Sequence, residues 1–233
     1  YYHVWDNGPA PKYNKKFYDS NDLIVSISKL TEEMVNEVGT TAKHIRIPHT
    51  IDESVYKILP DEEVAQFRKE HFGDDDKVIF FWNNRNTQRK NATTLMWWFK
   101  EFLDEVGHDK AALLMHTNPE EQTGSNLQES VTELGLDNGE VMLSPLKYES
   151  EKMAMLYNST DCTINISDAE GFGLSTLESL ACGTPIIVCK TGGLQEQITD
   201  GEQTFGIGIE PSTRTIIGSQ QVPYIYQDRI SKE

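Results

Sequence analysis

The chain has 233 residues, enough for one α/β domain with a sizeable core and part of a second. Its formal net charge of -16 argues against a general nucleic-acid binder, because contacts along a phosphate backbone need a basic face. The three cysteines lie in apolar stretches and are odd in number, which argues against a disulfide scaffold and favours a reducing, cytoplasmic location. No run approaches the roughly 18 apolar residues of a membrane-spanning helix, and no signal peptide is visible.

Residues 1–55 contain few predicted elements. Strands are predicted at 22–28 and 42–47, and a helix opened by a Ser/Thr cap is predicted at Lys29–Val38. Two strands and one helix cannot bury a core alone. We therefore interpret residues 1–55 as the end of a preceding α/β domain, whose front lies outside this sequence, followed by a linker.

Residues 56–233 begin with a helix predicted at about 62–71 and then alternate between short apolar runs and helical stretches. The apolar runs are nearly continuous, as expected of parallel strands covered on both faces. Strands are predicted at 77–82, Ala111–His116, 140–143, 162–166, 185–189 and, more weakly, 205–209. Helices are predicted at Ala92–Val106, Leu127–Leu134, 151–158, Leu174–Ala181 and 194–199. This alternation predicts a Rossmann-like α/β domain with an open parallel sheet, and no final helix is visible after residue 203.

A glycine-containing loop at residues 170–173 follows the strand predicted at 162–166. Open α/β sheets bind ligands at the carboxyl ends of their strands, where this loop begins. Gly171 and Gly173 allow a close approach of the backbone to a bulky group. The helix Leu174–Ala181 then directs its free N–H groups at the loop, which makes an anion site suited to a diphosphate.

Two carboxylates flank this predicted anion site. Glu170 precedes the glycines, and Glu178 lies about one turn into the helix. Beside a phosphate both would be repelled unless they bind something else. Sugar hydroxyls are natural partners, because one carboxylate accepts hydrogen bonds from two vicinal hydroxyls. The pattern therefore indicates a site for a nucleotide sugar.

The same residues resemble the signature of family-4 retaining glycosyltransferases of the GT-B fold, with Glu-x7-Glu around Gly-Phe-Gly, followed by Ala-Cys-Gly-Thr-Pro. The resemblance implies that Glu170 contacts the donor sugar and Glu178 contacts the nucleotide ribose. It also implies donor contacts from the backbone of the loop and of a following Gly-Gly loop. These residues are Gly171, Phe172, Gly173, Leu174, Ser175 and Gly193.

Further residues match the family upstream. Arg85 and Lys90 correspond to its Arg-x4-Lys pair, which neutralises the donor diphosphate, although Asn84 stands where the family usually has glycine. His3 takes the place of a family histidine that faces the reacting sugar. The resemblance thus implies that Glu170, Arg85, Lys90 and His3 serve catalysis.

The function implied is transfer of a sugar, with retention, from a UDP- or GDP-sugar to an unidentified glycan, lipid or protein acceptor. No metal or cofactor is expected, because no His/Cys/Asp/Glu cluster has metal-ligand spacing and residues 74–76 read as a solvated acidic turn. A weak peripheral membrane contact through the lysines at 12–16 is left open. The alternatives are a non-catalytic nucleotide-sugar-binding module and a GT-B nucleotide-sugar epimerase. A generic nucleotide-binding Rossmann domain is disfavoured, because Gly-x-Gly-x-x-Gly is absent after the first strand.

Overall fold

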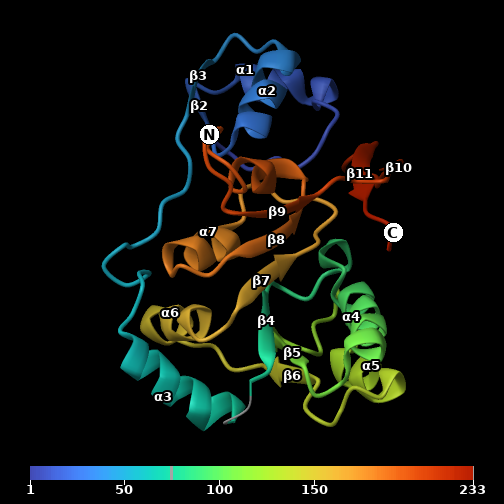
Figure 1. Cartoon of the computed structure of the whole chain (residues 1–233). Coiled ribbons are helices and arrows are strands. Elements are labelled where there is room, and N and C mark those ends of the chain that lie inside the picture. The colour runs from blue at the N-terminus through green and yellow to red at the C-terminus, as the bar shows by residue number, and fades with distance from the viewer. Residues whose placement is uncertain (74–75, 233) are drawn as a thin grey trace. The chain divides into compact units, whose positions relative to one another are not determined.

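The computed structural model describes residues 1–73 and 76–232 (Figure 1). Their contacts divide the chain into two compact units, which are described separately. Unit 1 comprises Tyr1–Thr50, Ser167–Leu174 and Val188–Glu233, and unit 2 comprises Ile51–Ile166 and Ser175–Ile187. The domain boundary inferred at 55/56 stays a prediction. No helix in the described part of the chain is long and apolar enough to cross a membrane.

The N-terminal part of unit 1 is a three-stranded parallel sheet in the order β1-β2-β3, with the predicted helix beside it. Helix α2 (Lys29–Val38) begins with a capping box between Ser28 and Thr31 and ends at Gly39, whose φ is +67°. Strand β1 and helix α1 were not predicted, because such short elements show no periodicity. The elements besides α2 are β1 (Tyr2–His3), the 3-10 turn η1 (Lys12–Asn14), α1 (Lys15–Asp19), β2 (Leu23–Ser26) and β3 (Lys43–Arg46).

The C-terminal part of unit 1 departs from the sequence-based prediction at two places. A 3-10 turn, η3 (Gly192–Glu196), stands where a helix was predicted at 194–199. Gly192 and Gly193 pack closely against the main chain at 170–172, and this contact overrides the helical pattern. After β9 (Gly206–Ile209) the chain forms an antiparallel hairpin of β10 (Thr213–Ile217) and β11 (Ile225–Arg229). These two strands are the only regular elements among the described residues after β9.

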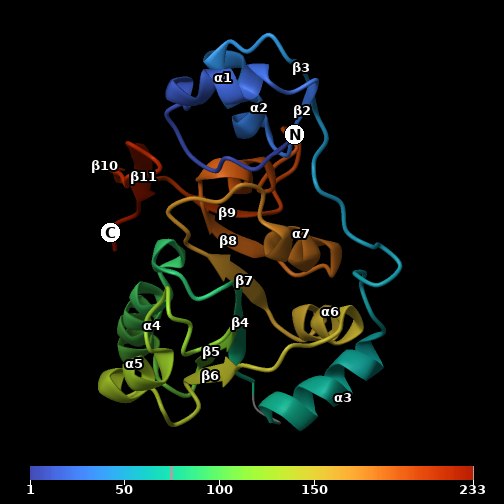
Figure 2. The ribbon, with the colours of Figure 1, turned by 180° about the vertical axis from the view of Figure 1, so that it is seen from behind.

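Unit 2 carries most of a six-stranded sheet with the order β6-β5-β4-β7-β8-β9. Helices α4 and α5 cover one face of this sheet, and α3 and α6 cover the other (Figures 1 and 2). The strands are β4 (Val78–Asn83), β5 (Ala111–His116), β6 (Val141–Ser144), β7 (Cys162–Asn165) and β8 (Ile186–Cys189). The helices are α3 (Asp61–Phe72), the turn η2 (Gln88–Lys90), α4 (Ala92–Val106), α5 (Leu127–Leu134), α6 (Ser150–Asn158) and α7 (Leu174–Ala181).

The strand order places the first strand of this sheet, β4, beside the fourth, β7, with which it pairs in parallel. The chain moves outward in one direction through β5 and β6 and then in the other through β8 and β9. Ligands of open α/β sheets bind outside the carboxyl ends of the strands at such a switch point. The segments that leave β4 at Asn83 and β7 at Asn165 therefore define where a site is expected.

Candidate functional site

The glycine loop at residues 167–174 is held by the segment at residues 191–197, and both belong to unit 1. The Thr191 hydroxyl donates to the carbonyl of Ser167 at 2.9 Å. The Gly193 N–H donates to the carbonyl of Glu170, also at 2.9 Å. The main chain on both sides of Ala169 is thus fixed by its neighbour before any ligand binds.

Gln197 continues this contact along the loop. Its buried side-chain amide donates to the carbonyl of Phe172 at 2.7 Å and to that of Gly173 at 2.9 Å. In a planar trans peptide the C=O and the following N–H point in opposite directions. The N–H groups of Gly173 and Leu174 are therefore both turned away from Gln197, which is the arrangement of an anion-binding concavity.

The glycine pair of this segment is required by the close approach. A Cβ on Gly192 would lie 1.7 Å from the carbonyl oxygen of Glu170, and the φ of Gly192 is +49°. A Cβ on Gly193 would lie 2.6 Å from the carbonyl oxygen of Gly171. The sequence-based prediction gave Gly193 a donor contact; in the structure its N–H binds Glu170 and its missing side chain allows the packing.

Glu178, on α7 in unit 2, is held by two tyrosines that sequence reasoning missed. The Tyr157 hydroxyl donates to Glu178 Oε2 at 2.8 Å, and the Tyr56 hydroxyl also hydrogen-bonds to this carboxylate. Burial raises the pKa of Glu178, and the two tyrosine hydrogen bonds offset part of that rise. The carboxylate is therefore an oriented acceptor within unit 2.

Tyr157 is itself completely buried on α6 and linked to the end of β4. The side-chain amide of Asn83 donates to the Tyr157 hydroxyl at 2.8 Å, and the Phe81 ring packs edge-on against the Tyr157 ring at 5.1 Å. Burial, with the nearby Glu178 carboxylate, raises the Tyr157 pKa well above its usual value, so the phenol stays protonated. Of these partners, only Asn83 gave a sequence signal, since it directly follows the strand predicted at 77–82, at the carboxyl edge of the sheet.

Arg85 lies in the segment after β4 and is largely exposed, with a carboxylate already on its guanidinium. Its Nε lies 3.3 Å from Glu121 Oε2 and its Nη2 lies 3.0 Å from Glu121 Oε1. The Arg85 guanidinium lowers the pKa of Glu121. Sequence reasoning did not find Glu121, because it is distant in the chain and carries no motif.

Lys90 is only 6% exposed at the end of η2. It is followed by Asn91, which adopts the left-handed conformation with φ of +56°. The Asn91 side-chain amide donates to the carbonyl of Ile166 at 3.0 Å. The segment after β4 is thereby attached to the residue that follows β7, and the predicted cation is buried rather than solvated.

His3 does not occupy the exposed position that a residue facing the reacting sugar needs. It is fully buried in unit 1, with Nε2 at 2.6 Å from the Tyr18 hydroxyl. Burial lowers its pKa to about 4, so the ring is neutral near pH 7. A two-residue strand that pairs with β2 takes its side chain into the interior, and the catalytic role of His3 stays a prediction.

The predicted residues therefore form two sets. Unit 1 brings residues 170–173 together with Gly193, and it also contains His3. Unit 2 contains Arg85, Lys90 and Glu178. At the junction, α7 begins with the exposed Leu174 and continues with the half-buried Ser175.

No metal centre is evident among residues 1–73 and 76–232, which contain no group of three or more His, Cys, Asp or Glu side chains able to hold a metal ion. Asp74 and Asp75 of the acidic turn lie outside the described residues. All three cysteines are buried free thiols.

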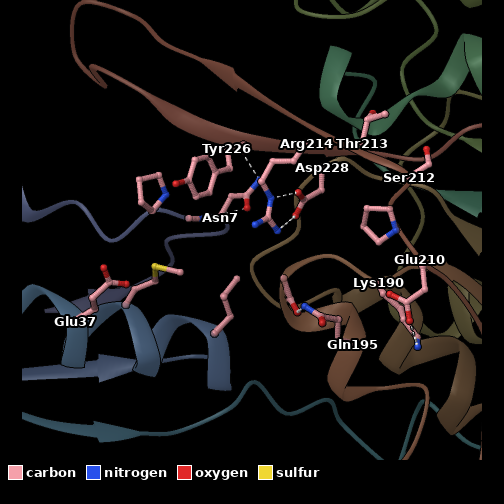
Figure 3. Close-up of a pocket in the computed structure, with 16 residues that line it drawn as sticks. Asn7, Glu37, Lys190, Gln195, Glu210, Ser212, Thr213, Arg214, Tyr226 and Asp228 are labelled. Atoms are coloured by element: carbon pink, nitrogen blue, oxygen red, sulfur yellow. Dashed lines mark hydrogen bonds and ion pairs between the residues drawn. The ribbon is translucent and has the colours of Figure 1, made fainter.

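A cavity of about 730 Å³ opens in unit 1 between the N-terminal segment and the β10–β11 hairpin. Figure 3 shows Arg214 in this cavity, held by Asp228 and lying beside the Tyr226 ring. Both charges of the Arg214–Asp228 pair are thus already matched. None of the sequence-predicted site residues lines this cavity.

Comparison with known proteins identifies the family. A profile of the group 1 glycosyl transferases matches residues 63–215. This chain belongs to the group 1 glycosyl transferases. The match confirms the family resemblance inferred from the sequence, and it covers β4, β7 and the loop before α7.

Individual relatives match over shorter segments. The D-inositol 3-phosphate glycosyltransferase of Acidothermus cellulolyticus is 34% identical over 76 residues, which cover 33% of this chain and 16% of that protein. The protein of the same name from Paenarthrobacter aurescens is 36% identical over 76 residues, 33% of this chain and 18% of that protein.

Solved structures are similar over most of the chain. Sucrose-phosphate synthase from Thermosynechococcus elongatus superimposes with a TM-score of 0.70 at 21% identity, covering 86% of this chain and 48% of that one. Anabaena HepE, solved with UDP and glucose, gives a TM-score of 0.73 at 18% identity, covering 91% and 57%. These likenesses confirm the α/β fold class with parallel sheets, matching that of GT-B glycosyltransferases. The chain spans about half the length of these structures.

Proposed function

We propose that this chain carries the donor site of a retaining, metal-independent glycosyltransferase that uses a nucleoside-diphosphate sugar. The observation that carries the proposal is the loop at 170–173, whose peptide N–H groups are turned outward by Gln197 as the chain enters α7. Family membership supports the reaction class. The complexes of HepE with UDP and with UDP-glucose support the class of donor.

The diphosphate is assigned to the main chain at the start of α7. The N–H groups of Gly173 and Leu174 point to the same side, and the positive end of the helix dipole adds to their field. Glu170 is assigned to hydroxyls of the transferred sugar and Glu178 to hydroxyls of the ribose. The two carboxylates thereby bind the uncharged ends of a ligand whose charge lies in its centre.

The leaving group is assigned to the two cations that follow β4. As the bond between the anomeric carbon and the phosphate oxygen breaks, negative charge collects on the diphosphate, and Arg85 and Lys90 stabilise it. Arg85 can exchange the carboxylate of Glu121 for a phosphate, since its planar fork binds either in the same bidentate way. These cations and the α7 N-terminus supply enough positive charge for departure, so the proposal requires no divalent ion.

Retention follows from the resemblance rather than from a carboxylate nucleophile. The acceptor oxygen bonds to the anomeric carbon on the face that the phosphate leaves, and its proton passes to a phosphate oxygen of the departing diphosphate. Both glutamates then remain binding groups. This differs from retaining glycosidases, in which one of two carboxylates forms a covalent intermediate.

The first experiment measures donor binding to the chain by calorimetry with UDP, GDP, UDP-glucose and GDP-mannose. We expect one nucleotide series to bind, Glu178→Ala to weaken the nucleotide by about tenfold, and Glu170→Ala to weaken the sugar nucleotide more than the bare nucleotide. Absence of binding by every nucleotide would contradict the proposal. Proton NMR of a transfer product tests retention, and activity in excess EDTA tests metal independence.

A second candidate is a non-catalytic module that binds the donor without transferring its sugar. Both candidates use the same donor-site residues, and they differ only in whether the sugar is transferred. Binding without donor hydrolysis or transfer, with several glycan and lipid acceptors present, would select this candidate. Turnover by the chain would exclude it.

A further inference from the structure

We propose that Tyr157 is a positioning residue for the donor, whose hydroxyl, together with that of Tyr56, orients the Glu178 carboxylate toward the ribose hydroxyls. This inference rests on the proposed donor site. It adds two residues that lie outside the Glu-x7-Glu motif and come from separate parts of unit 2.

The direction of the hydrogen bonds is set by Asn83. Its side-chain amide nitrogen can only donate, and it lies 2.8 Å from the Tyr157 hydroxyl oxygen. That oxygen is therefore an acceptor toward Asn83. The single proton of the phenol is left for Glu178 Oε2, also at 2.8 Å. The chain from Asn83 through Tyr157 to Glu178 thus has one polarity, which favours an accepting carboxylate at its end.

The hydroxyl of Tyr157 has little freedom to move. The side chain is completely buried, and Phe81 packs against its ring. The main chain is fixed as well, since the Thr184 hydroxyl donates to the Tyr157 carbonyl at 2.6 Å. A ring enclosed in this way holds its hydroxyl at one point, so the carboxylate that accepts from it is held too.

Tyr56 supplies the second donor from the connector before α3. Its hydroxyl hydrogen-bonds to Glu178, and its ring lies 6.3 Å from that of Tyr157. A carboxylate has about four acceptor positions on its two oxygens. Two tyrosines occupy two of these positions, and the two that are left suit the paired hydroxyls of a ribose.

The tyrosines also act on the charge of Glu178. Burial raises the pKa of this carboxyl, and each tyrosine hydrogen bond lowers it. Loss of the Tyr157 hydroxyl should therefore raise the Glu178 pKa further. Because a protonated carboxyl is a poorer acceptor, ribose binding should then fail at a higher pH than in the unaltered chain.

The test compares Tyr157→Phe, Tyr56→Phe and the control Tyr148→Phe by calorimetry between pH 5 and pH 8. Tyr148 lies just before α6 and stacks on His116. The probes are UDP and GDP with their 2′-deoxy analogues. We expect Tyr157→Phe to weaken the ribonucleotide about tenfold, to move the acidic limb of binding upward, and to weaken the deoxy analogue less. Tyr148→Phe should change none of these quantities.

The outcomes separate the two proposals. Binding of neither ribonucleotide by the unaltered chain overturns the proposed function. Ribonucleotide binding with an unchanged pH profile in Tyr157→Phe, or equal weakening of ribo and deoxy forms, overturns the positioning role alone. If Tyr157→Phe does not fold, as judged by circular dichroism, the less buried Tyr56→Phe decides by the same two criteria.

Discussion

A main-chain contact holds the first glutamate of the motif, and side-chain contacts hold the second. Glu170 is fixed through its main chain, since its carbonyl accepts from the Gly193 N–H. Glu178 is fixed through its side chain, since its carboxylate accepts from Tyr157 and Tyr56. A main-chain contact of this kind places the residue, whereas side-chain contacts fix the carboxylate itself. Under the proposed function, Glu170 would meet the sugar that changes shape during the reaction, and Glu178 would meet the ribose that does not.

The largest expected effect comes from breaking the main-chain contact. Gly192→Ala places a Cβ 1.7 Å from the Glu170 carbonyl oxygen at a φ of +49°, so we expect a loss of about 3–5 kcal/mol in the free energy of unfolding. Gly201→Ala is the matched control, because its φ is +100° but no atom lies within 4 Å of the added Cβ. Urea unfolding that gives equal losses for both variants would remove the steric explanation.

The next largest effect on stability is expected at His3, whose ring nitrogen Nε2 is hydrogen-bonded to the Tyr18 hydroxyl. Burial lowers its pKa from 6.5 to about 4, so the unfolded chain binds a proton in this window that the folded chain does not. Stability should therefore fall as pH falls from 6.5 to 4, by about 3 kcal/mol in total, and His3→Gln should flatten this loss.

His108 provides the opposite sign as a control. Its hydrogen bonds to Asp104 and Glu140 raise its pKa, so it contributes stability below pH 6.5 that is lost as pH rises through the raised value. His108→Gln should steepen the acid loss where His3→Gln flattens it. If His3→Gln and His108→Gln lose the same free energy of unfolding between pH 7 and pH 5, the burial argument for His3 is contradicted.

Gln197→Leu tests the loop contact without a steric clash. One buried and one part-buried carbonyl lose their shared donor, which should cost about 1–3 kcal/mol in the free energy of unfolding and weaken pyrophosphate binding. Gln195→Leu is the control, because that exposed side chain reaches only the Gly192 carbonyl at 3.2 Å. Equal pyrophosphate affinity in both variants would show that Gln197 does not orient the anion site.

Glu178→Gln, with Glu170→Gln beside it, tests the burial of the Glu178 carboxylate. The raised pKa of Glu178 means that the folded chain keeps a proton that the unfolded chain loses, so stability falls as pH rises from 4.5 through the raised value. Glu178→Gln should remove this fall. Glu170→Gln keeps the contact with Gly193. A stability–pH profile of Glu178→Gln that still declines over this window would count against the burial of its charge.

The smallest expected effect is at Arg85. Glu121→Gln removes the carboxylate from an exposed guanidinium, so stability should change by less than about 0.5 kcal/mol. Diphosphate affinity should rise about threefold, because the ligand no longer competes with Glu121. Glu120→Gln is the neighbouring control. An unchanged affinity in Glu121→Gln would indicate that Arg85 does not contact the diphosphate.

The parts of the fold predicted correctly are those with strong local signals. Helix α2 has its cap at Ser28, and the continuous apolar runs gave the strands of the large sheet to within a residue or two. The hairpin of β10 and β11 was missed, because the exposed positions of β10 show no hydrophobic alternation. The helix predicted at 194–199 was wrong, because tertiary contacts at Gly192 and Gly193 override the local pattern.

Residues of the candidate site were likewise found where the signal is local and missed where the partner is distant in the chain. Glycines at 192 and 193 are visible in a sequence because close main-chain packing permits nothing else. Tyr157 and Glu121 are not, because each reaches its partner across the fold and nothing nearby in the chain marks the contact. The burial of His3 was missed for a similar reason, since its partner Tyr18 is on a short helix that shows no periodicity.

The hydrogen bonds from Gln197 also bear on the energetics of ligand capture. Two consecutive peptide dipoles are aligned in parallel by a side chain of the protein itself. The free-energy cost of their mutual repulsion and of ordering the loop is therefore incurred during folding and not on ligand binding. For a diphosphate bound here as proposed, this field needs almost no reorganisation, so binding should lose little conformational entropy.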